Sequence, residues 1–331
     1  MESEDIERLV HEALEQIGWD ADAEQVAKRV KRLHYGLPRE DEFSVICGWL
    51  GNCQLIHKLD QHQFPEKSKS HYQVPDLLAV FKYKEKDIPV LIEVKTSGKK
   101  NKLSFTPEYK EKLENYAELL DLPMLIAWKN KWDVWALVSL DEFKVANKNY
   151  NLDFESALKS SLLGILAGDF AYTLGANSGV HIGCKKEELV SANEIENGES
   201  QYWSVVVDDV YFTNRLSERV KDLSPLAQKI FHSWDLDESE EVTDTHIIIH
   251  CIADETSMLF AHMALTRILK FESPVDETNV HWRSILATNS SLARLESFRE
   301  GIMENLSKKI VSHVLEPQPQ NLPNFLEKYN N

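Results

Sequence analysis

The chain has 331 residues, of which 43% are hydrophobic and 27% are charged, and its formal net charge is −17 at pH 7. This length can bury a sizeable core, and it predicts either two domains or one decorated domain. No run of about twenty apolar residues occurs and no basic segment precedes an apolar one, so we expect neither a transmembrane helix nor a signal peptide. The four cysteines form no C-x-x-C pair, which argues against a zinc site or a disulfide framework and favours a cytoplasmic location.

Charge is unevenly distributed along the chain. Residues 1–65, 66–148 and 149–331 carry formal net charges of −6, +2 and −13. We expect the positive middle segment to face any polyanion, because the distribution of charge governs such binding more than its sum. Some of its lysines follow a predicted strand and are expected to contact phosphates from a loop: Lys99, Lys100 and Lys102. The alternative is that these lysines are solvated and protect the edge of a hairpin.

Three helices are predicted before the first strand. Residues 4–17 and 22–34 have amphipathic spacing and are separated by Gly18. The third helix begins near Pro38, which suits a first helical turn, and ends at Gly51.

The third helix carries three consecutive acidic residues close to its start. Glu42, Ile46 and Trp49 recur at i, i+4 and i+7, so we expect Glu42 to lie on the inward-facing stripe. Glu40 and Asp41 are competing candidates for the inward-facing carboxylate. The alternative for all three is that they only favour the start of the helix through its dipole.

A strand, a turn and a second strand are predicted further along. Residues 74–83 (VPDLLAVFKY) run into the polar cluster 84–87, and residues 88–95 (IPVLIEVK) form the second arm. Alternate residues of a strand share a face, so Glu93 and Lys95 project together from an otherwise apolar strand. Burying such charges is costly unless they are paired or bind a metal.

The two arms of this hairpin together predict a metal site. Asp76 on one arm and Glu93 on the other supply carboxylate oxygens, the ligands that Mg²⁺ prefers, and this ion needs only one or two of them. Lys95 would stand beside the metal, where it would either orient a water molecule or neutralise a phosphoryl oxygen.

Pro75-Asp76, sixteen further residues and then Glu93-Val94-Lys95 resemble the motif of the PD-(D/E)xK nuclease superfamily, which includes resolvase-like and RecB-like members. The core of that superfamily has the order helix, strand, strand, strand, helix, strand, and this order can be followed over residues 38–140. The resemblance implies an α/β fold with a restriction-endonuclease-like core, in which helices flank a mixed sheet. An N-terminal helical segment and a C-terminal α/β accessory domain would be added to it. The remaining core elements are predicted at 54–60, 106–120, 123–128 and 132–140.

The resemblance also implies roles for the site residues. Asp76 and Glu93 would hold one or two Mg²⁺ ions, for which Mn²⁺ would substitute, and the backbone carbonyl of Val94 would be a further ligand. Glu42, on the first core helix, would be an additional metal ligand or would support one. The catalytic residues would be Asp76, Glu93 and Lys95.

A pair of residues on the helix after the motif is also implied to take part. RecB-like members often carry Gln and Tyr at i and i+4 on this helix, where they contact the lysine or the nucleic acid. Lys112 and Tyr116 have this spacing here, and Lys112 stands where Gln is usual.

The remainder of the chain does not continue this core. Helices are predicted at 152–175, 222–234, 257–271 and 290–314, strands at 181–188, 202–212 and 245–254, and an acidic loop at 235–241. His246 and His250 share one face of a strand and would suit a transition metal, although histidines in strands are more commonly ordinary core or surface residues. The predicted domains are a helical segment at 1–36, the nuclease core at 37–145, an accessory domain at 146–315 and a flexible tail at 316–331.

The function expected from these features is a metal-dependent endonuclease that hydrolyses DNA, with host defence or restriction as its context. Because the chain is acidic, specificity would come from a homo-oligomer, from a partner protein bound through the C-terminal region, or from a narrow site. No membrane partner is expected. One alternative is an RNA-directed or ligand-gated effector nuclease. Another is a catalytically inactive nucleic-acid-binding or scaffold module.

Overall fold

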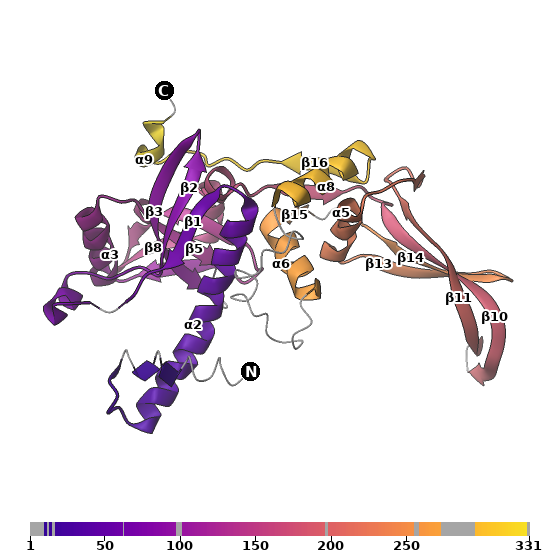
Figure 1. Ribbon diagram of the computed structural model, residues 1–331, viewed down its shortest axis with the longest axis horizontal. Helices are drawn as coiled ribbons and strands as arrows, with labels where there is room; N and C mark the ends of the chain where they lie inside the picture. The colour runs from indigo at the N-terminus through magenta and orange to yellow at the C-terminus, as the bar shows by residue number, and fades with distance from the viewer. Residues whose placement is uncertain are drawn as a thin grey trace. The chain divides into compact units, whose positions relative to one another are not determined.

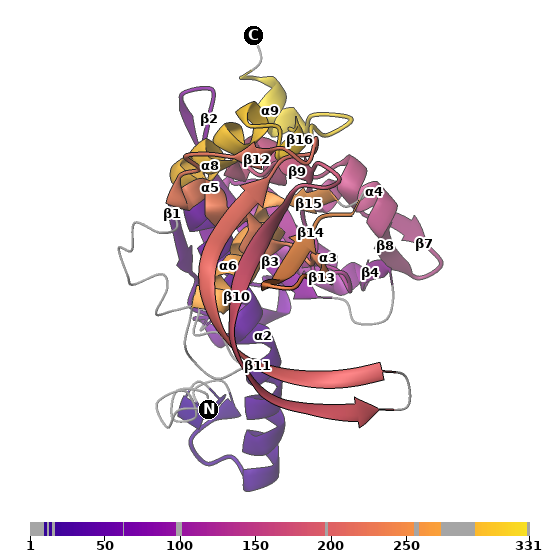
Figure 2. The ribbon, with the colours of Figure 1, turned by 90° about the vertical axis from the view of Figure 1, so that its right-hand side faces the viewer.

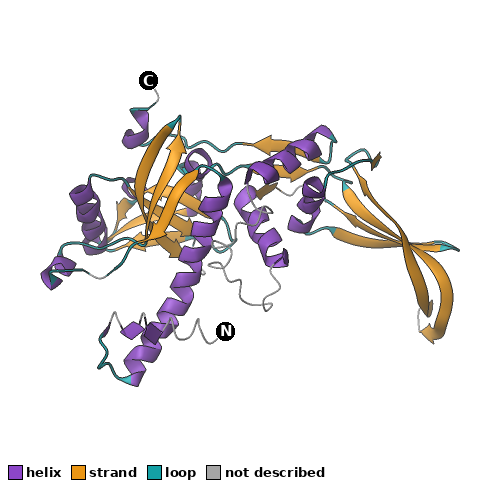
Figure 3. Cartoon of the chain, in the orientation of Figure 1, coloured by secondary structure: helices purple, strands orange, loops and turns teal. Residues whose placement is uncertain are grey.

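The computed structural model describes residues 10–11, 13–14, 17–61, 63–96, 101–195, 198–254, 258–272 and 295–329 (Figures 1 and 3). The chain forms two compact units. The first unit consists of residues 1–169, 272–295 and 316–331, and the second of residues 170–271 and 296–315. The chain therefore leaves the first unit at residue 169, whereas the sequence predicted a boundary between residues 145 and 146.

The first unit is built on a mixed five-stranded sheet. Its strand order is β1–β2–β3–β5–β6, and only the β3–β5 pair is parallel. The strands are β1 (Cys53–Lys58), β2 (Leu77–Tyr83), β3 (Lys86–Thr96), β5 (Met124–Lys129) and β6 (Trp135–Ser139). Helix α3 (Pro107–Leu120) makes the crossover that a parallel pair requires. With α2 (Ala23–Leu50) in front, this is the predicted order of helix, three strands, helix and strand, and the predicted fold class is confirmed.

Helix α2 is longer than expected, because the two helices predicted at 22–34 and from Pro38 are one continuous element. It begins after Asp22, whose side chain accepts a hydrogen bond from the backbone N–H of Gln25 at 2.9 Å, and it ends at Gly51, which has φ 98°. The predicted boundary between residues 36 and 37 therefore falls inside a helix. The predicted helix at 4–17 lies mostly outside the described residues.

The core of the first unit surrounds the two C-terminal strands of the sheet. Every residue of β5 and of β6 is buried, as expected for strands that are covered on both faces. Helix α3 covers one side, with Leu113 fully buried, and it begins at Thr106, whose hydroxyl accepts from the N–H of Tyr109 at 3.2 Å. The end of α2 also enters the core, where Phe43 and Leu50 are buried.

A small sheet with the order β4–β8–β7 completes the first unit. Strands β7 (Lys144–Ala146) and β8 (Asn149–Asp153) form a hairpin, and β8 pairs with β4 (Lys102–Phe105). The polar segment that predicted a domain boundary at residue 145 is this hairpin. Its polar composition comes from exposure at a sheet edge and not from a linker.

The prediction of one long helix at 152–175 is wrong. Asp153 caps the short helix α4 (Phe154–Lys159), which is followed by one π-helical turn, η3 (Leu163–Ala167), and then by strand β9 (Ala171–Leu174). Gly168 ends the π-helical turn with φ 93°, and a Cβ atom there would meet the backbone oxygen of Leu50 at 2.8 Å. The segment resembles one helix because each short piece contributes buried apolar residues, such as Ala157 in α4 and Leu166 in η3, so periodicity cannot separate the pieces.

The second unit contains a five-stranded antiparallel sheet with the order β12–β11–β10–β14–β13. Its longest strands, β10 (Gly179–Ile195) and β11 (Gly198–Thr213), form an extended curved ribbon (Figure 2). The other strands are β12 (Arg219–Val220), β13 (Asp237–Val242) and β14 (His246–Ile252). The predicted strands at 181–188, 202–212 and 245–254 are confirmed, but the predicted acidic loop at 235–241 is largely the exposed edge strand β13.

A three-stranded sheet and short helices complete the second unit. The sheet has the order β15–β9–β16, with β15 at Met258–Phe260 and β16 at Val311–Leu315. The helices are α5 (Pro225–Gln228), η4 (Lys229–Ser233), α6 (Ala261–Glu272) and α8 (Leu295–Ser307). The last helix predicted from 290 to 314 is therefore α8 followed by a strand, and its first residues lie outside the described part of the chain.

The C-terminal segment predicted to be flexible is partly helical and belongs to the first unit. Helix α9 (Asn324–Glu327) buries Leu326, and the backbone N–H of Gln320 donates to the carbonyl of Lys159 at 2.8 Å. No helix among the described residues has both the length and the apolar character needed to span a membrane.

Candidate active site

The β2–β3 hairpin brings the predicted carboxylates together. Leu77 pairs with Ile92, so Asp76, directly before β2, lies beside Glu93 on β3. Asp76 is buried, and its Oδ2 accepts a hydrogen bond from the backbone N–H of Val94 at 2.7 Å. Its Oδ1 accepts from the side-chain amide of Gln61 at 3.0 Å. The predicted hairpin is therefore present, and its register places the two acidic side chains at one point.

Glu93 is 2% exposed, and its two oxygens differ in their contacts. Oε1 accepts hydrogen bonds from the Nζ of Lys95 and from the hydroxyl of Tyr109. Oε2 is buried and has no hydrogen-bond partner among the described residues. Leaving a buried acceptor without a partner costs about 1–3 kcal/mol, and more for a charged group. A buried carboxylate oxygen that is left over beside a second carboxylate fits a divalent cation.

The electrostatics of the site favour the addition of positive charge. The pKa of Asp76 is raised well above its usual value, first by burial and then by the charges of Glu93 and Glu40. Burial lowers the pKa of Lys95, but the charges of Glu93, Tyr109 and Asp76 outweigh burial and raise it overall. Lys95 is therefore firmly protonated. Its ammonium group is the positive charge that acts on Asp76 and Glu93, two carboxylates that repel each other.

Helix α2 presents Glu40, and not Glu42, to this pair. Lys58 on β1 bridges Glu40 Oε2 at 2.8 Å and Asp41 Oδ1 at 3.0 Å. The charge of Glu40 contributes to the raised pKa of Asp76. Residues two apart on a helix point in different directions, so Glu40 and Glu42 cannot face the same site. The sequence expectation that Glu42 reaches the metal site therefore differs from the geometry.

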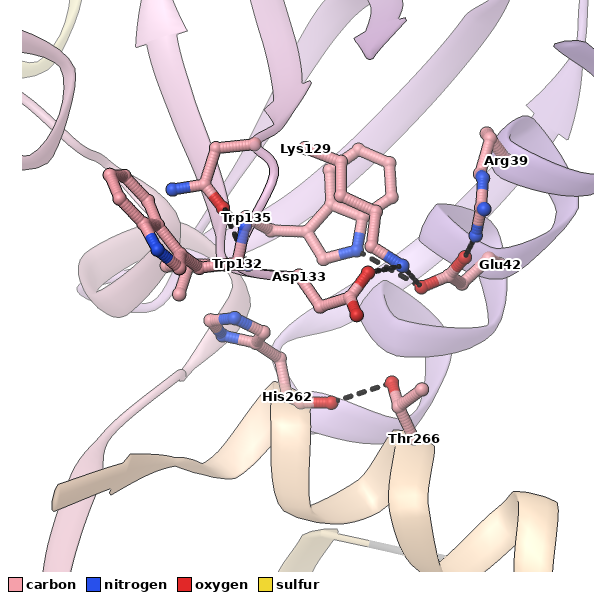
Figure 4. A network of polar contacts seen from close by, with 10 residues as sticks. Arg39, Glu42, Lys129, Trp132, Asp133, Trp135, His262 and Thr266 are labelled. Carbon is pink, nitrogen blue, oxygen red and sulfur yellow. Dashed lines mark hydrogen bonds and ion pairs between the residues drawn. The ribbon is translucent and has the colours of Figure 1, made fainter. Parts of the chain in front are cut away.

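Glu42 instead belongs to a buried ion network (Figure 4). Its Oε1 lies 2.6 Å from the Nζ of Lys129, and its Oε2 lies 2.7 Å from Arg39. The indole N–H of Trp135 also reaches Oε1 at 3.4 Å, and Asp133 lies 2.9 Å from the same Lys129 ammonium. Glu42 is 1% exposed, so it does face inward as predicted, but both of its oxygens are already engaged. The network joins α2 to β5 and β6.

The helix residue that contacts the site is Tyr109, which the sequence reasoning missed. The predicted pair lies elsewhere on α3, where Lys112 makes an ion pair with Glu108 at 2.8 Å and Tyr116 packs against the apolar core. Tyr109 precedes Tyr116 by seven residues and lies on the same stripe, two turns closer to the helix start. The seven-residue spacing could have identified Tyr109 from the sequence, because it places Tyr109 on the same face of α3 as Tyr116. It is the first turn of α3, and not its middle, that lies beside Glu93.

The remaining predicted residues are placed less specifically. Lys102 is exposed at the start of β4, whereas Lys99 and Lys100 lie outside the described residues. The role of the Val94 carbonyl as a metal ligand stays a prediction, as do the nucleic-acid contacts of Lys102, Lys112 and Tyr116.

The two histidines of β14 do not share a metal site. His246 contacts Asp208 at 3.0 Å, and His250 Nδ1 lies 2.7 Å from His181 Nδ1. Among the described residues no group of three or more His, Cys, Asp or Glu side chains is placed to hold a metal. The Asp76–Glu93 pair contributes two carboxylates, which is as many as Mg²⁺ usually takes from protein.

A match to a family model agrees with the motif. The family model described as archaeal Holliday junction resolvase (Hjc) matches residues 65–166. No curated protein matches the chain. A solved structure of Hjc from the archaeal hyperthermophile Archaeoglobus fulgidus shares 18% identity, covers 37% of this chain and 91% of its own, and has a TM-score of 0.31. The matched segment contains Asp76, Glu93, Lys95 and Tyr109, and the chain carries a nuclease domain of the PD-(D/E)xK superfamily.

Proposed function

We propose that the chain is a metal-dependent endonuclease that hydrolyses phosphodiester bonds of branched DNA, with a four-way junction as its substrate. The observation that carries the proposal is the unpartnered, buried Oε2 of Glu93 beside Asp76 and Lys95. The junction as substrate rests on the family model that matches residues 65–166. The host-defence context expected from the sequence receives no support from the comparisons.

Asp76 and Glu93 would hold the cation, together with the backbone carbonyl of Val94, and the charge of Glu40 would add to the negative potential at Asp76. Mg²⁺ or Mn²⁺ bound there would polarise the scissile phosphate and lower the pKa of a bound water. Asp76 is fixed for this task by the N–H of Val94 at 2.7 Å, and Glu93 is fixed through Oε1 by Lys95 and Tyr109. Such supporting hydrogen bonds orient the ligand oxygens.

Lys95 would act as a cation and not as a base. Its raised pKa keeps it protonated at neutral pH, so its ammonium donates hydrogen bonds and cannot accept a proton. Its side chain is 31% exposed, which leaves it accessible to a phosphate oxygen. It would stabilise the negative charge that develops on the pentavalent phosphorus.

Resolution of a four-way junction needs two cuts that are related by symmetry, so the active form would be a homodimer with one site in each subunit. The net charge of −17 predicts weak binding that falls steeply with salt. A dimer would offset this weakness by contacting two arms at once.

The test is cleavage of a four-way junction, linear duplex DNA, single-stranded DNA and RNA, with Mg²⁺, Mn²⁺ or EDTA. The variants are Asp76→Ala and Lys95→Ala, and the matched control is Lys82→Ala, which removes an exposed lysine from the neighbouring strand β2. Metal-dependent junction cleavage that is lost in the first two variants and kept in the control supports the proposal. Cleavage that persists in Lys95→Ala or in EDTA contradicts the mechanism, and cleavage of RNA alone contradicts the substrate.

A further inference from the structure

The loop between β1 and β2 presents an exposed aromatic ring. Phe64 is 84% exposed, which makes it the most exposed large hydrophobic side chain in the described part of the chain. It is followed by the 3₁₀ helix η1 (Glu66–Ser70), whose Lys67 and Lys69 are also exposed. A single exposed apolar residue needs no explanation by itself. Phe64 becomes informative because of how its loop is held and what that loop contacts.

The loop is fixed internally and to helix α3. Within the loop, the backbone N–H of Ser68 donates to the carbonyl of Pro65 at 2.8 Å, and the Ser68 hydroxyl donates to Gln63 at 3.2 Å. Toward α3, the carbonyl of His71 accepts from the amide of Asn115 at 3.1 Å. The ring therefore sits on a preorganised support, so little conformational entropy remains to be lost when a ligand binds it.

The same loop reaches the metal-binding carboxylate. Gln61 donates to Asp76 Oδ1 at 3.0 Å, and Phe64 follows Gln61 by three residues. Three residues span at most about 11 Å of extended chain. At about 3.4 Å per nucleotide along a strand, this distance corresponds to about three nucleotides. Phe64 therefore lies within a few nucleotides of any phosphate that is bound at the catalytic carboxylates.

We propose that residues 63–73 form a base-stacking element, in which Phe64 stacks against a nucleobase that is unpaired or unstacked at a DNA branch point. Lys67 and Lys69 contact the flanking phosphates, and Gln61 joins the occupied loop to Asp76. This inference rests on the proposed function, because it assigns the feature of branched DNA that the nuclease recognises.

A nucleobase fits this ring better than other partners for two reasons. Stacking on an aromatic side chain requires only a π-face, so it tolerates any base sequence, which suits selection of DNA by its structure. In a continuous duplex both faces of each base are covered by neighbours, and exposing one costs a few kcal/mol, whereas this cost is lowest where pairing is already disrupted. A fixed aromatic ring near the cleavage site thus favours branched over linear DNA.

The test measures binding in EDTA, where metal-dependent cleavage does not interfere. The probes are a four-way DNA junction with 2-aminopurine at the branch point and a fully paired duplex of the same length. The variants are Phe64→Ala, Phe64→Trp, which keeps a stacking surface, and Val145→Ala, a control that trims another exposed apolar residue on strand β7. A further variant, Lys67→Ala/Lys69→Ala, examines the phosphate contacts.

We expect Phe64→Ala to bind the junction about 5- to 150-fold more weakly, the range for loss of one stacked base, with a smaller loss on the duplex. The 2-aminopurine signal that wild type produces should disappear, and Phe64→Trp should retain both binding and signal. The double lysine variant should weaken binding to both DNAs and reduce the slope of log affinity against log salt by about two. Val145→Ala should behave as wild type.

Three results would overturn the inference: unchanged junction affinity in Phe64→Ala, equal losses on junction and duplex, or wild type that binds the junction no more tightly than the duplex. The proposed function is judged separately, by whether Asp76→Ala loses the metal-dependent cleavage that wild type shows. A nuclease that cuts junctions normally with Phe64→Ala would therefore keep its function and lose this recognition element.

Discussion

Replacement of Glu42 by Gln separates a structural carboxylate from a catalytic one. Glu42 and Lys129 are 1% and 4% exposed, and removal of one partner from such a buried pair costs about 3–5 kcal/mol. Arg39 is 44% exposed, so its ion pair with Glu42 adds at most about 1 kcal/mol. The Gln oxygen can still accept from Lys129, and Asp133 remains beside that ammonium. We therefore expect the lower end, about 3 kcal/mol of lost stability.

The assay is urea unfolding monitored by far-UV circular dichroism. An unchanged slope of the free energy of unfolding against urea concentration would show that only the stability has changed. The matched control is Glu40→Gln, whose partner Lys58 is 27% exposed, and which should lose no more than about 1 kcal/mol. Cleavage should show the reverse order, with activity lost in Glu40→Gln and kept by folded Glu42→Gln. The reasoning is refuted if Glu42→Gln is as stable as wild type, or if it abolishes Mn²⁺ binding while Glu40→Gln does not.

Two further predictions concern the hydrogen bond of Tyr109 and the titration of His181. Tyr109→Phe removes the donor that fixes Glu93 and should lower Mn²⁺ affinity or cleavage about 10- to 100-fold, measured by cleavage rate against Mn²⁺ concentration; an unchanged curve would exclude a positioning role. Burial and then His250 lower the pKa of His181 below 6.5, so the unfolded chain takes up a proton first and the free energy of unfolding should fall as the pH drops below 6.5. His181→Gln should flatten this pH dependence in urea titrations, and an equally steep dependence in the variant would assign it to other groups.

The parts of the fold that the sequence predicted well are those in which local and long-range preferences agree. The β2–β3 hairpin combines apolar arms with a polar turn, and α3 begins with Thr106 and Pro107, a cap and a first-turn residue that both favour a helix start. Prediction failed where a buried segment lacks a single period. Residues 152–175 mix apolar residues with charged ones such as Glu155 and Lys159, and tertiary contacts divide them into a strand end, two short helical pieces and another strand.

The candidate site shows the same limit at the level of side chains. The two-residue alternation of a strand placed Glu93 and Lys95 on one face. This was enough to predict their contact, because both residues lie on the same strand of one hairpin. The helical period of α2 correctly placed Glu42 in the interior, but a stripe does not specify which neighbour it will meet. That neighbour, Lys129, is 87 residues away in the chain, so its contact with Glu42 depends on the assembled sheet.

The ribbon of β10 and β11 has a consequence for how related chains can vary in length. Strand β14 pairs with β10 only from Gly179 to Lys185, so beyond that point the two long strands pair only with each other in the described residues. Deleting one residue from a strand reverses which face every later side chain occupies, whereas deleting matched residues from both arms preserves the pairing. We expect evolution to have lengthened and shortened this ribbon in matched steps, while the segment bordered by β14 kept its length.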